Sequence, residues 1–190
     1  MEREVVQGLI ARGLPEHIAY GIAGNISVES RFDPGINEIS PLVKGSRGGY
    51  GLNQWTGPRR RQFESYAEDR GQGVSDLDTQ LDFTLWELEN TERAAMNALM
   101  GAENVDDAAR IYSQKFLRPG IPHLDRRISE ANRLAGAGYE GAPQGRAAPE
   151  QSAPERPNPL RLAYSGQNAA DFMVQQNQLA ARPDAYTRYL

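Results

Sequence analysis

The chain is 190 residues long, 39 % of them hydrophobic, and carries a formal net charge of −4 at pH 7. This length accommodates one domain of ordinary size and an additional segment. Lysine and arginine are dispersed apart from the run at residues 59–61, which suits a solvated helix face or contact with an anionic polymer. A protein that coats nucleic acid needs a concentrated positive field, so the composition argues against a nucleic-acid partner.

Several chemistries lack the residues that they need. The absence of cysteine excludes disulfides, thiol nucleophiles and most structural zinc sites. The two histidines, His17 and His123, fit no zinc-binding pattern, so we expect no metal and no other cofactor. The N-terminal residues are charged and amphipathic, unlike a signal peptide, and no apolar run approaches the roughly 18 residues of a membrane span. We therefore expect no signal peptide and no membrane partner.

Residues 1–140 have the pattern of consecutive helices. The first covers about residues 2–12 and ends at Gly13. Pro15 suits the first turn of a second helix that runs to about Ser30. Residues 33–56 are rich in glycine and proline, which predicts a loop with room for a short hairpin.

A third helix starts near Pro58, and four more follow it. The fourth starts at Ser75, has an acidic residue at capping-box spacing and carries leucines at intervals of four, four and three. The fifth covers about residues 92–101, the sixth about 105–116, and the last begins after Pro122. We expect an α+β fold that is predominantly α-helical.

The composition changes near residue 140. Five of the 12 prolines fall between residues 141 and 160, among alanine, glycine, glutamine and arginine. Such a segment cannot form a core, which predicts an extended proline-rich linker at 139–160. Apolar residues at about 167–181 suit one side of a short helix. We predict a domain at 1–138, the linker, and a docking segment at 161–190.

Glu29 stands at the end of the second helix. It follows Ile22 by seven residues and Ile26 by three, so it continues the apolar stripe of that helix. A carboxylate on an apolar face is costly unless it is paired or used. Partial desolvation favours the protonated form of a carboxyl group, and a general acid for glycoside cleavage needs that form. The alternative is an ordinary ion pair with Arg31 or Arg47.

Glycine recurs at two places. Gly21 and Gly24 allow another element to approach the second helix closely. In GSRGGYGLNQW (45–55), glycines let the backbone lie flat against a ligand, but neither a preceding strand nor a Gly-Lys-Ser/Thr ending supports a phosphate loop. Gln54 and Trp55 add an amide and an aromatic ring, which suit carbohydrate binding. Core packing is the alternative for Trp55.

Two of these stretches, GNISVESRFDP (24–34) and GGYGLNQWTGPRR (48–60), together resemble the phage tail lysozyme family, which is related to lytic transglycosylases and goose-type lysozymes. Such relatives pair Glu-Ser at a helix end with a Gly-Leu-x-Gln loop, here 29–30 and 51–54. QLDFTLWELEN (80–90) and FLRPGIPHLDRRISEA (116–131) resemble later segments of the family. The resemblance covers about residues 1–138 and implies a lysozyme-like domain.

The resemblance also implies roles for individual residues. Glu29 is expected to be the catalytic acid. The residues expected to contact substrate in a saccharide groove are Gln54, Trp55, Ser30, Tyr50 and Gly51. No clear second catalytic carboxylate follows from it.

Two acidic residues nearby in sequence are candidates for that second carboxylate. Glu38 lies in the loop, whereas Asp33 in Phe-Asp-Pro suits an Asx-type turn better than catalysis. An inverting hydrolase needs the second carboxylate about 6.5–9.5 Å from the first, and a retaining one about 5–5.5 Å. With neither, the substrate's own N-acetyl group can act as nucleophile and an anhydro product can result. Muramidase and lytic transglycosylase both remain open.

We expect a bacteriophage muramidase that cleaves the bond between N-acetylmuramic acid and N-acetylglucosamine in bacterial peptidoglycan. The C-terminal segment suits an anchor to other tail or virion proteins. The expected location is therefore the virion, with action in the host periplasm and cell wall as the genome enters. The alternatives are a lytic transglycosylase, a cytoplasmic endolysin, and a catalytically silent structural tail component.

Overall fold

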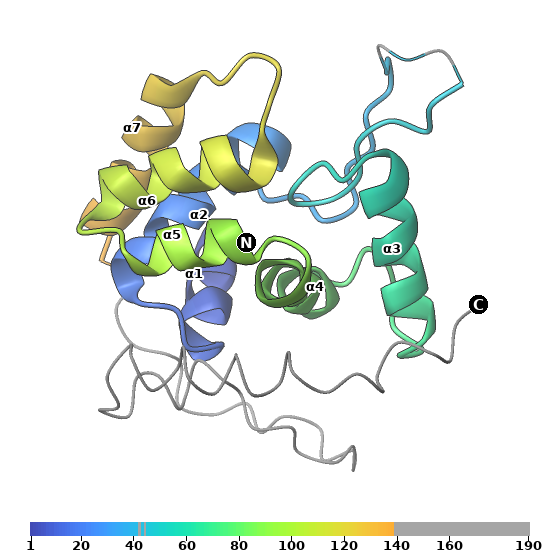
Figure 1. Cartoon of the computed structure of the whole chain (residues 1–190), viewed down its shortest axis with the longest axis horizontal. Helices are drawn as coiled ribbons and strands as arrows, with labels where there is room; N and C mark the ends of the chain where they lie inside the picture. Colours follow the sequence, from blue (N-terminus) through green and yellow to red (C-terminus); the bar gives the residue numbers. More distant parts are fainter. Residues whose placement is uncertain (42, 44, 139–190) are drawn as a thin grey trace. The chain divides into compact units, whose positions relative to one another are not determined.

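The computed structural model describes residues 1–41, 43 and 45–138, and this part is predominantly α-helical (Figure 1). Its elements in chain order are α1 (Glu2–Ala11), α2 (Glu16–Ser30), α3 (Gly57–Glu68), α4 (Leu77–Asn90), α5 (Arg93–Met100), α6 (Val105–Ile111), the π-helical η1 (Tyr112–Leu117) and α7 (Leu124–Gly136). Within these residues no helix is long and apolar enough to cross a membrane. The predicted linker and docking segment lie outside the described residues.

Helix α2 is the centre of the packing. It contacts α1, α6 and α7, and its apolar stripe of Ile18, Ile22 and Ile26 is fully buried. Figure 1 shows α2 beside α6 and α7, whereas α3 packs on α4. Burial of each such side chain contributes roughly 1.5–3 kcal/mol, so this helix is a rigid base for the residues at its end.

Two glycines set the distance between α2 and its neighbours. A Cβ atom on Gly21 would lie 2.5 Å from the Cβ of Ala108 on α6 and 2.7 Å from the backbone nitrogen of Ala109. A Cβ on Gly24 would lie 2.5 Å from the Cβ of Ala131 on α7 and 2.6 Å from its backbone nitrogen. The close approach predicted from the sequence is therefore confirmed, and two helices use it.

Helix α4 begins differently from the prediction. Its cap is Asp76, whose Oδ1 accepts a hydrogen bond from the backbone N–H of Thr79 at 2.9 Å. The capping box expected at Ser75 is wrong, because the adjacent carboxylate serves the free N–H groups of the first turn. Three of the four leucines of the predicted stripe are buried.

The segment between α2 and α3 has little regular structure. Isolated antiparallel bridges join Asn37 to Tyr50 and Tyr50 to Trp55. Among the described residues these bridges stand where the short hairpin was expected, and no strand accompanies them. The helical part of the predicted fold class is confirmed, and its β part has no further counterpart in this region.

The sixth predicted helix changes its geometry part-way. Helix α6 ends at Ile111 and the chain continues as the π-helical η1. The rings of Tyr112 and Phe116 stack there with centroids 4.6 Å apart. The buried Oγ of Ser113 has no hydrogen-bond partner among the described residues. Apolar periodicity locates such a helix but does not reveal its widened turn.

Candidate active site

Glu29 lies in the last turn of α2, and its side chain is 17 % exposed. Its Oε1 is 2.8 Å from Nη2 of Arg127 on α7. Within the part of the chain that the structure describes, Oε2 accepts no hydrogen bond, and the shortest ion-pair contact is made by Oε1. The ion pair considered from the sequence therefore exists, but its partner is Arg127 and not Arg31 or Arg47. One carboxylate oxygen is held and the other is available.

Arg127 is itself fixed on several sides. Its side chain is 3 % exposed, its Nε donates to the Pro122 carbonyl at 2.6 Å, and its Nη1 donates to Oδ1 of Asn25 at 3.2 Å. Asn25 in turn donates to the carbonyls of Gly21 and Ala109, both at 2.9 Å. Every nitrogen of the guanidinium group thus has an acceptor. The position of Glu29 is linked through these bonds to α6 and α7.

The chain turns sharply directly after the Glu-Ser pair. Arg31 and Phe32 both adopt left-handed backbone conformations, with φ of 54° and 63°. This region is unfavourable for residues other than glycine, and such residues persist where the surroundings hold them. Phe32 is buried, so its packing holds the turn that ends α2 beside Glu29.

The glycine-rich loop is fastened to α4 by one buried amide. Oε1 of Gln80 accepts a hydrogen bond from the backbone N–H of Leu52 at 2.8 Å, and Nε2 donates to the carbonyls of Pro34 and Val74. Gly51 has φ of 68°, and a Cβ there would lie 2.5 Å from Gln80 Oε1. Glycine at this position is required by both its conformation and its neighbour.

Two of the predicted substrate-contacting residues keep partly exposed side chains. Gln54 uses its Nε2 to donate to the Gly51 carbonyl at 2.9 Å, and its own φ is 50°. Tyr50 lies under the guanidinium of Arg60, 5.0 Å from the ring centroid, and burial raises the pKa of its phenol. Contact of Gln54, Tyr50 and the buried Gly51 with a saccharide stays a prediction.

Two other predicted contact residues are buried. Trp55 is 1 % exposed and stacks on Phe63, with ring centroids 4.7 Å apart, while its Nε1 donates to Glu87 at 2.6 Å. Ser30 is also buried, and its Oγ donates to the carbonyl of Ile26 at 3.1 Å. In the structure both side chains are buried, and their contact with substrate stays a prediction. For Trp55 this burial is the core-packing alternative.

Both candidates for a second carboxylate hold the loop backbone. Asp33 Oδ1 accepts from the backbone N–H of Gly35 at 2.8 Å, which confirms the predicted Asx-type turn. Glu38 Oε2 accepts from the backbone N–H of Gly49 at 2.9 Å. A catalytic role of Glu38 stays a prediction. The described residues contain no group of three or more acidic or histidine side chains that could hold a metal.

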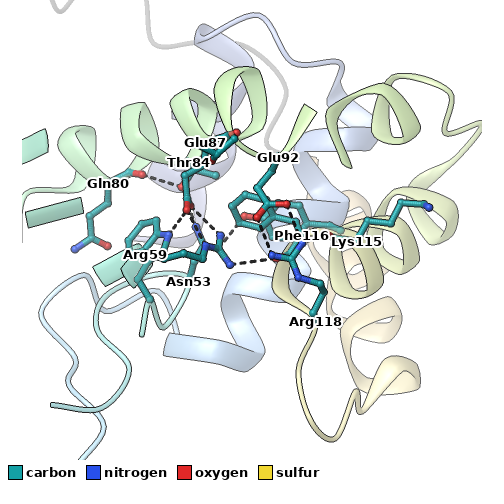
Figure 2. Close-up of polar contacts among 12 residues, drawn as sticks. Asn53, Arg59, Gln80, Thr84, Glu87, Glu92, Lys115, Phe116 and Arg118 are labelled. Atoms are coloured by element: carbon teal, nitrogen blue, oxygen red, sulfur yellow. Dashed lines mark hydrogen bonds and ion pairs between the residues drawn. The ribbon is translucent and has the colours of Figure 1, made fainter. Parts of the chain in front are cut away.

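The arginine run is largely structural. Arg59 forms two contacts with the carboxylate of Glu87, at 2.7 and 2.8 Å, and its Nη1 donates to the carbonyl of Phe116 (Figure 2). The side chain of Glu87 is 1 % exposed. Arg60 is buried and donates to Glu64 and to two loop carbonyls. Only Arg61 is exposed and matches the solvated helix face considered for the run.

Comparison with known proteins identifies the family to which the chain belongs. The family model described as phage tail lysozyme matches residues 1–137. The chain belongs to the phage tail lysozyme family. Among curated proteins it is similar to morphogenesis protein 1 of Bacillus phage B103, with 27 % identity over 149 residues. The matched region is 72 % of this chain and 40 % of that relative, so the chain spans well under half of the relative's length.

In this phage tail lysozyme family member, sequence reasoning missed several residues that build the site. Arg127 and Asn25 were not singled out, although both lie within the quoted family segments. Asn53 was also missed: it accepts from the Tyr112 hydroxyl and donates to Thr84 Oγ1, both at 2.8 Å (Figure 2 labels Asn53 and Thr84). The sequence did carry a signal for Arg127. Ala131, which was predicted to face inward, follows it by four residues, so Arg127 is a polar residue on the inward face of an amphipathic helix.

Proposed function

We propose that this phage lysozyme-like protein is a muramidase that cleaves peptidoglycan between N-acetylmuramic acid and N-acetylglucosamine, with Glu29 as the general acid. The observation that carries the proposal is the state of Glu29. It is a partly buried carboxyl group with one oxygen 2.8 Å from Arg127 and the other without a hydrogen bond among the described residues, in a member of the phage tail lysozyme family. Carboxylates that serve only structure are usually saturated by their partners.

The proposed reaction begins with proton transfer from Glu29 to the glycosidic oxygen. The bond between that oxygen and C1 breaks, and its electron pair remains on the protonated leaving group. Water then adds to C1 and releases a proton, which restores Glu29. The product is a reducing end, and the net change is the addition of one water molecule.

Lytic transglycosylation is a second candidate, favoured by the contacts of Asp33 and Glu38. One carboxylate oxygen of each is engaged with loop backbone. In this version Glu29 first gives its proton to the glycosidic oxygen, and the substrate's N-acetyl oxygen attacks C1 as the bond between C1 and the protonated leaving group breaks. Glu29 then removes a proton from the C6 hydroxyl, whose oxygen displaces the acetamido oxygen from C1. The product carries a 1,6-anhydro bond and no water is added.

Mass spectrometry of digested, purified peptidoglycan tests both versions. Reducing muropeptides are expected from a muramidase, and species lighter by one water are expected from a transglycosylase. Glu29→Gln serves as the matched variant because it keeps the size of the side chain and one oxygen that can accept from Arg127, but cannot donate a proton as an acid. If Glu29→Gln clears peptidoglycan at the parent rate, the assignment of the acid is wrong. If the parent protein releases no glycan fragments, the protein is better explained as a catalytically silent structural component of the tail.

We infer further that the protein is carried on the virion and opens the host wall as the genome enters. The support is the family and the name of the relative, a morphogenesis protein of a phage. The test is a variant truncated after residue 140. Activity on peptidoglycan should persist while incorporation into particles is lost. Detection of the full chain only in lysates, and not in purified virions, would instead indicate an endolysin.

A further inference from the structure

The strongest unassigned feature is the bonded chain that runs from α6 through Asn25 and Arg127 to Glu29. It joins three helices by side chains that are almost fully buried. Burying a guanidinium group is costly unless each of its donors finds an acceptor. Here each of the three guanidinium nitrogens contacts an oxygen, and one of these oxygens belongs to the carboxylate proposed as the acid.

We propose that Arg127 is a positioning residue for Glu29, and that Asn25 and the Pro122 carbonyl set the orientation of Arg127. The inference rests on the proposed function of Glu29. Arg127 Nη2 makes its shortest contact with Oε1, so the proton that Glu29 donates is carried on Oε2, which accepts no hydrogen bond among the described residues. The arrangement therefore selects one oxygen of the carboxyl group for chemistry.

The same contact has an electrostatic consequence. When Glu29 gives up its proton, negative charge develops on the carboxylate 2.8 Å from a fixed positive charge. A preorganised charge aimed at a group that becomes ionised during the reaction lowers the barrier without reorganisation. Geometry contributes as well, because a displacement of about 1 Å can cost on the order of 10²-fold in rate. Arg127 thus acts on turnover and not on saccharide affinity.

Two features, the exposure of the side chain and the contact with Glu29, separate Arg127 from the other arginine on α7 that pairs with acidic residues. Arg133 contacts Glu2 and Glu130, but its side chain is 46 % exposed, whereas that of Arg127 is 3 % exposed. Arg133 has no contact with Glu29. It is therefore a matched control: it lies on the same helix, it loses an ion pair when replaced, and it lies outside the proposed site.

The experiment compares the full chain with Arg127→Met, Arg127→Lys and Arg133→Met on soluble, uncrosslinked glycan strands. Arg127→Met should lower kcat by about 10–100-fold with KM within about twofold of the parent. Arg127→Lys keeps the charge but cannot make three directed contacts, so it should recover part of the lost kcat. Arg133→Met should leave both constants within about twofold. A kcat for Arg127→Met equal to that of the parent overturns the inference, as does a lysine variant no better than methionine.

Asn25→Ala is the second variant if Arg127→Met does not fold. It leaves the charge of Arg127 and the carboxyl of Glu29 in place, and it removes the Oδ1 acceptor of Arg127 together with the Nδ2 donor to the carbonyls of Gly21 and Ala109. A lowered kcat with KM unchanged supports positioning, and a parent kcat contradicts it. Glu29→Gln distinguishes a failure of the proposed function from a failure of the role assigned to Arg127. Parent activity of Glu29→Gln rejects the proposed function, whereas an inactive Glu29→Gln together with a fully active Arg127→Met rejects only the role of Arg127.

Discussion

Two carboxylate–arginine pairs of this protein can be compared directly: Glu29 with Arg127 between α2 and α7, and Glu87 with Arg59 between α4 and α3. Both pairs are close, with their shortest contacts at 2.8 and 2.7 Å. They differ in saturation. Glu87 is 1 % exposed, and both of its oxygens accept hydrogen bonds, one of them also from Trp55.

Saturation distinguishes the pair that holds helices together from the pair that is open to a ligand. In the Glu87 pair the carboxylate is saturated and the arginine is the more exposed partner, at 25 %. In the Glu29 pair the arginine is saturated and the carboxylate is the more exposed partner. A saturated buried carboxylate holds helices together, whereas one with an open oxygen can exchange a proton with a ligand.

The largest effect is expected at Glu29. Glu29→Gln should lower the rate of peptidoglycan cleavage by about 10²–10⁴-fold, because a positioned general acid contributes that much. Its melting temperature should stay close to that of the parent, since the amide oxygen can still accept from Arg127. Turnover of glycan strands and calorimetry measure the two quantities on one preparation. A large loss of stability in Glu29→Gln would show that the Glu29 pair, like the Glu87 pair, holds helices together.

Glu87→Gln should show the reverse pattern. Removing one partner of a buried ion pair costs about 3–5 kcal/mol of unfolding free energy, because the remaining charge is left uncompensated. Denaturant titration measures the loss. The control is the double variant Glu87→Leu with Arg59→Met, in which no charge stays buried, and most of the lost stability should return. An unchanged unfolding midpoint for Glu87→Gln would show that this pair does not hold the helices.

The helix contacts around α2 predict a smaller effect. Gly24→Ala places a Cβ 2.5 Å from that of Ala131 and should cost about 1–3 kcal/mol. Gly136→Ala on α7 is the control, because no atom of the described residues lies within 4 Å of its added Cβ. That variant should be neutral or gain up to about 1 kcal/mol. Equal unfolding midpoints for the two variants would contradict the close approach of α7 to α2.

The smallest effect concerns Glu89, which is half-buried and has no ion-pair partner among the described residues. Burial raises the pKa of this carboxyl above its ordinary value of 4.5. The raised pKa means that ionised Glu89 disfavours folding at neutral pH, and this cost disappears as the pH falls through the folded-state pKa. Glu89→Gln should therefore raise the melting temperature at pH 7 and leave it unchanged below pH 4.5.

Glu64 provides the control of opposite sign. Burial acts to raise its pKa, but hydrogen bonds from Arg47 and Arg60 outweigh this and leave the pKa below 4.5. The stability from this group is present above pH 4.5 and is lost as the pH falls through the lower folded-state pKa. Glu64→Gln should lower the melting temperature at pH 7. Melting curves of Glu89→Gln and Glu64→Gln across pH measure the two effects. Melting temperatures that shift in the same direction at pH 7 would contradict the predicted difference in sign.

Local features of the chain were sufficient for much of the fold. Pro15 marked the start of α2, the leucine spacing located α4, and the Phe-Asp-Pro sequence indicated the turn at Asp33. These succeed because helix starts, apolar periodicity and Asx turns depend on residues a few positions apart. The start of α4 was misassigned for the same reason: Ser75 and Asp76 are both good caps, and the sequence alone does not choose between them.

Patterns within the chain were enough to predict the succession of helices, the close approach at Gly21 and Gly24, and the place of Glu29 at the end of an apolar stripe. Contacts between distant segments select the arginine that meets Glu29, place Trp55 in the core and pair Arg59 with Glu87. The physical reason is separation along the chain. A guanidinium on an amphipathic helix has the same local pattern whether it faces solvent or a carboxylate, and the packing of distant helices makes that choice.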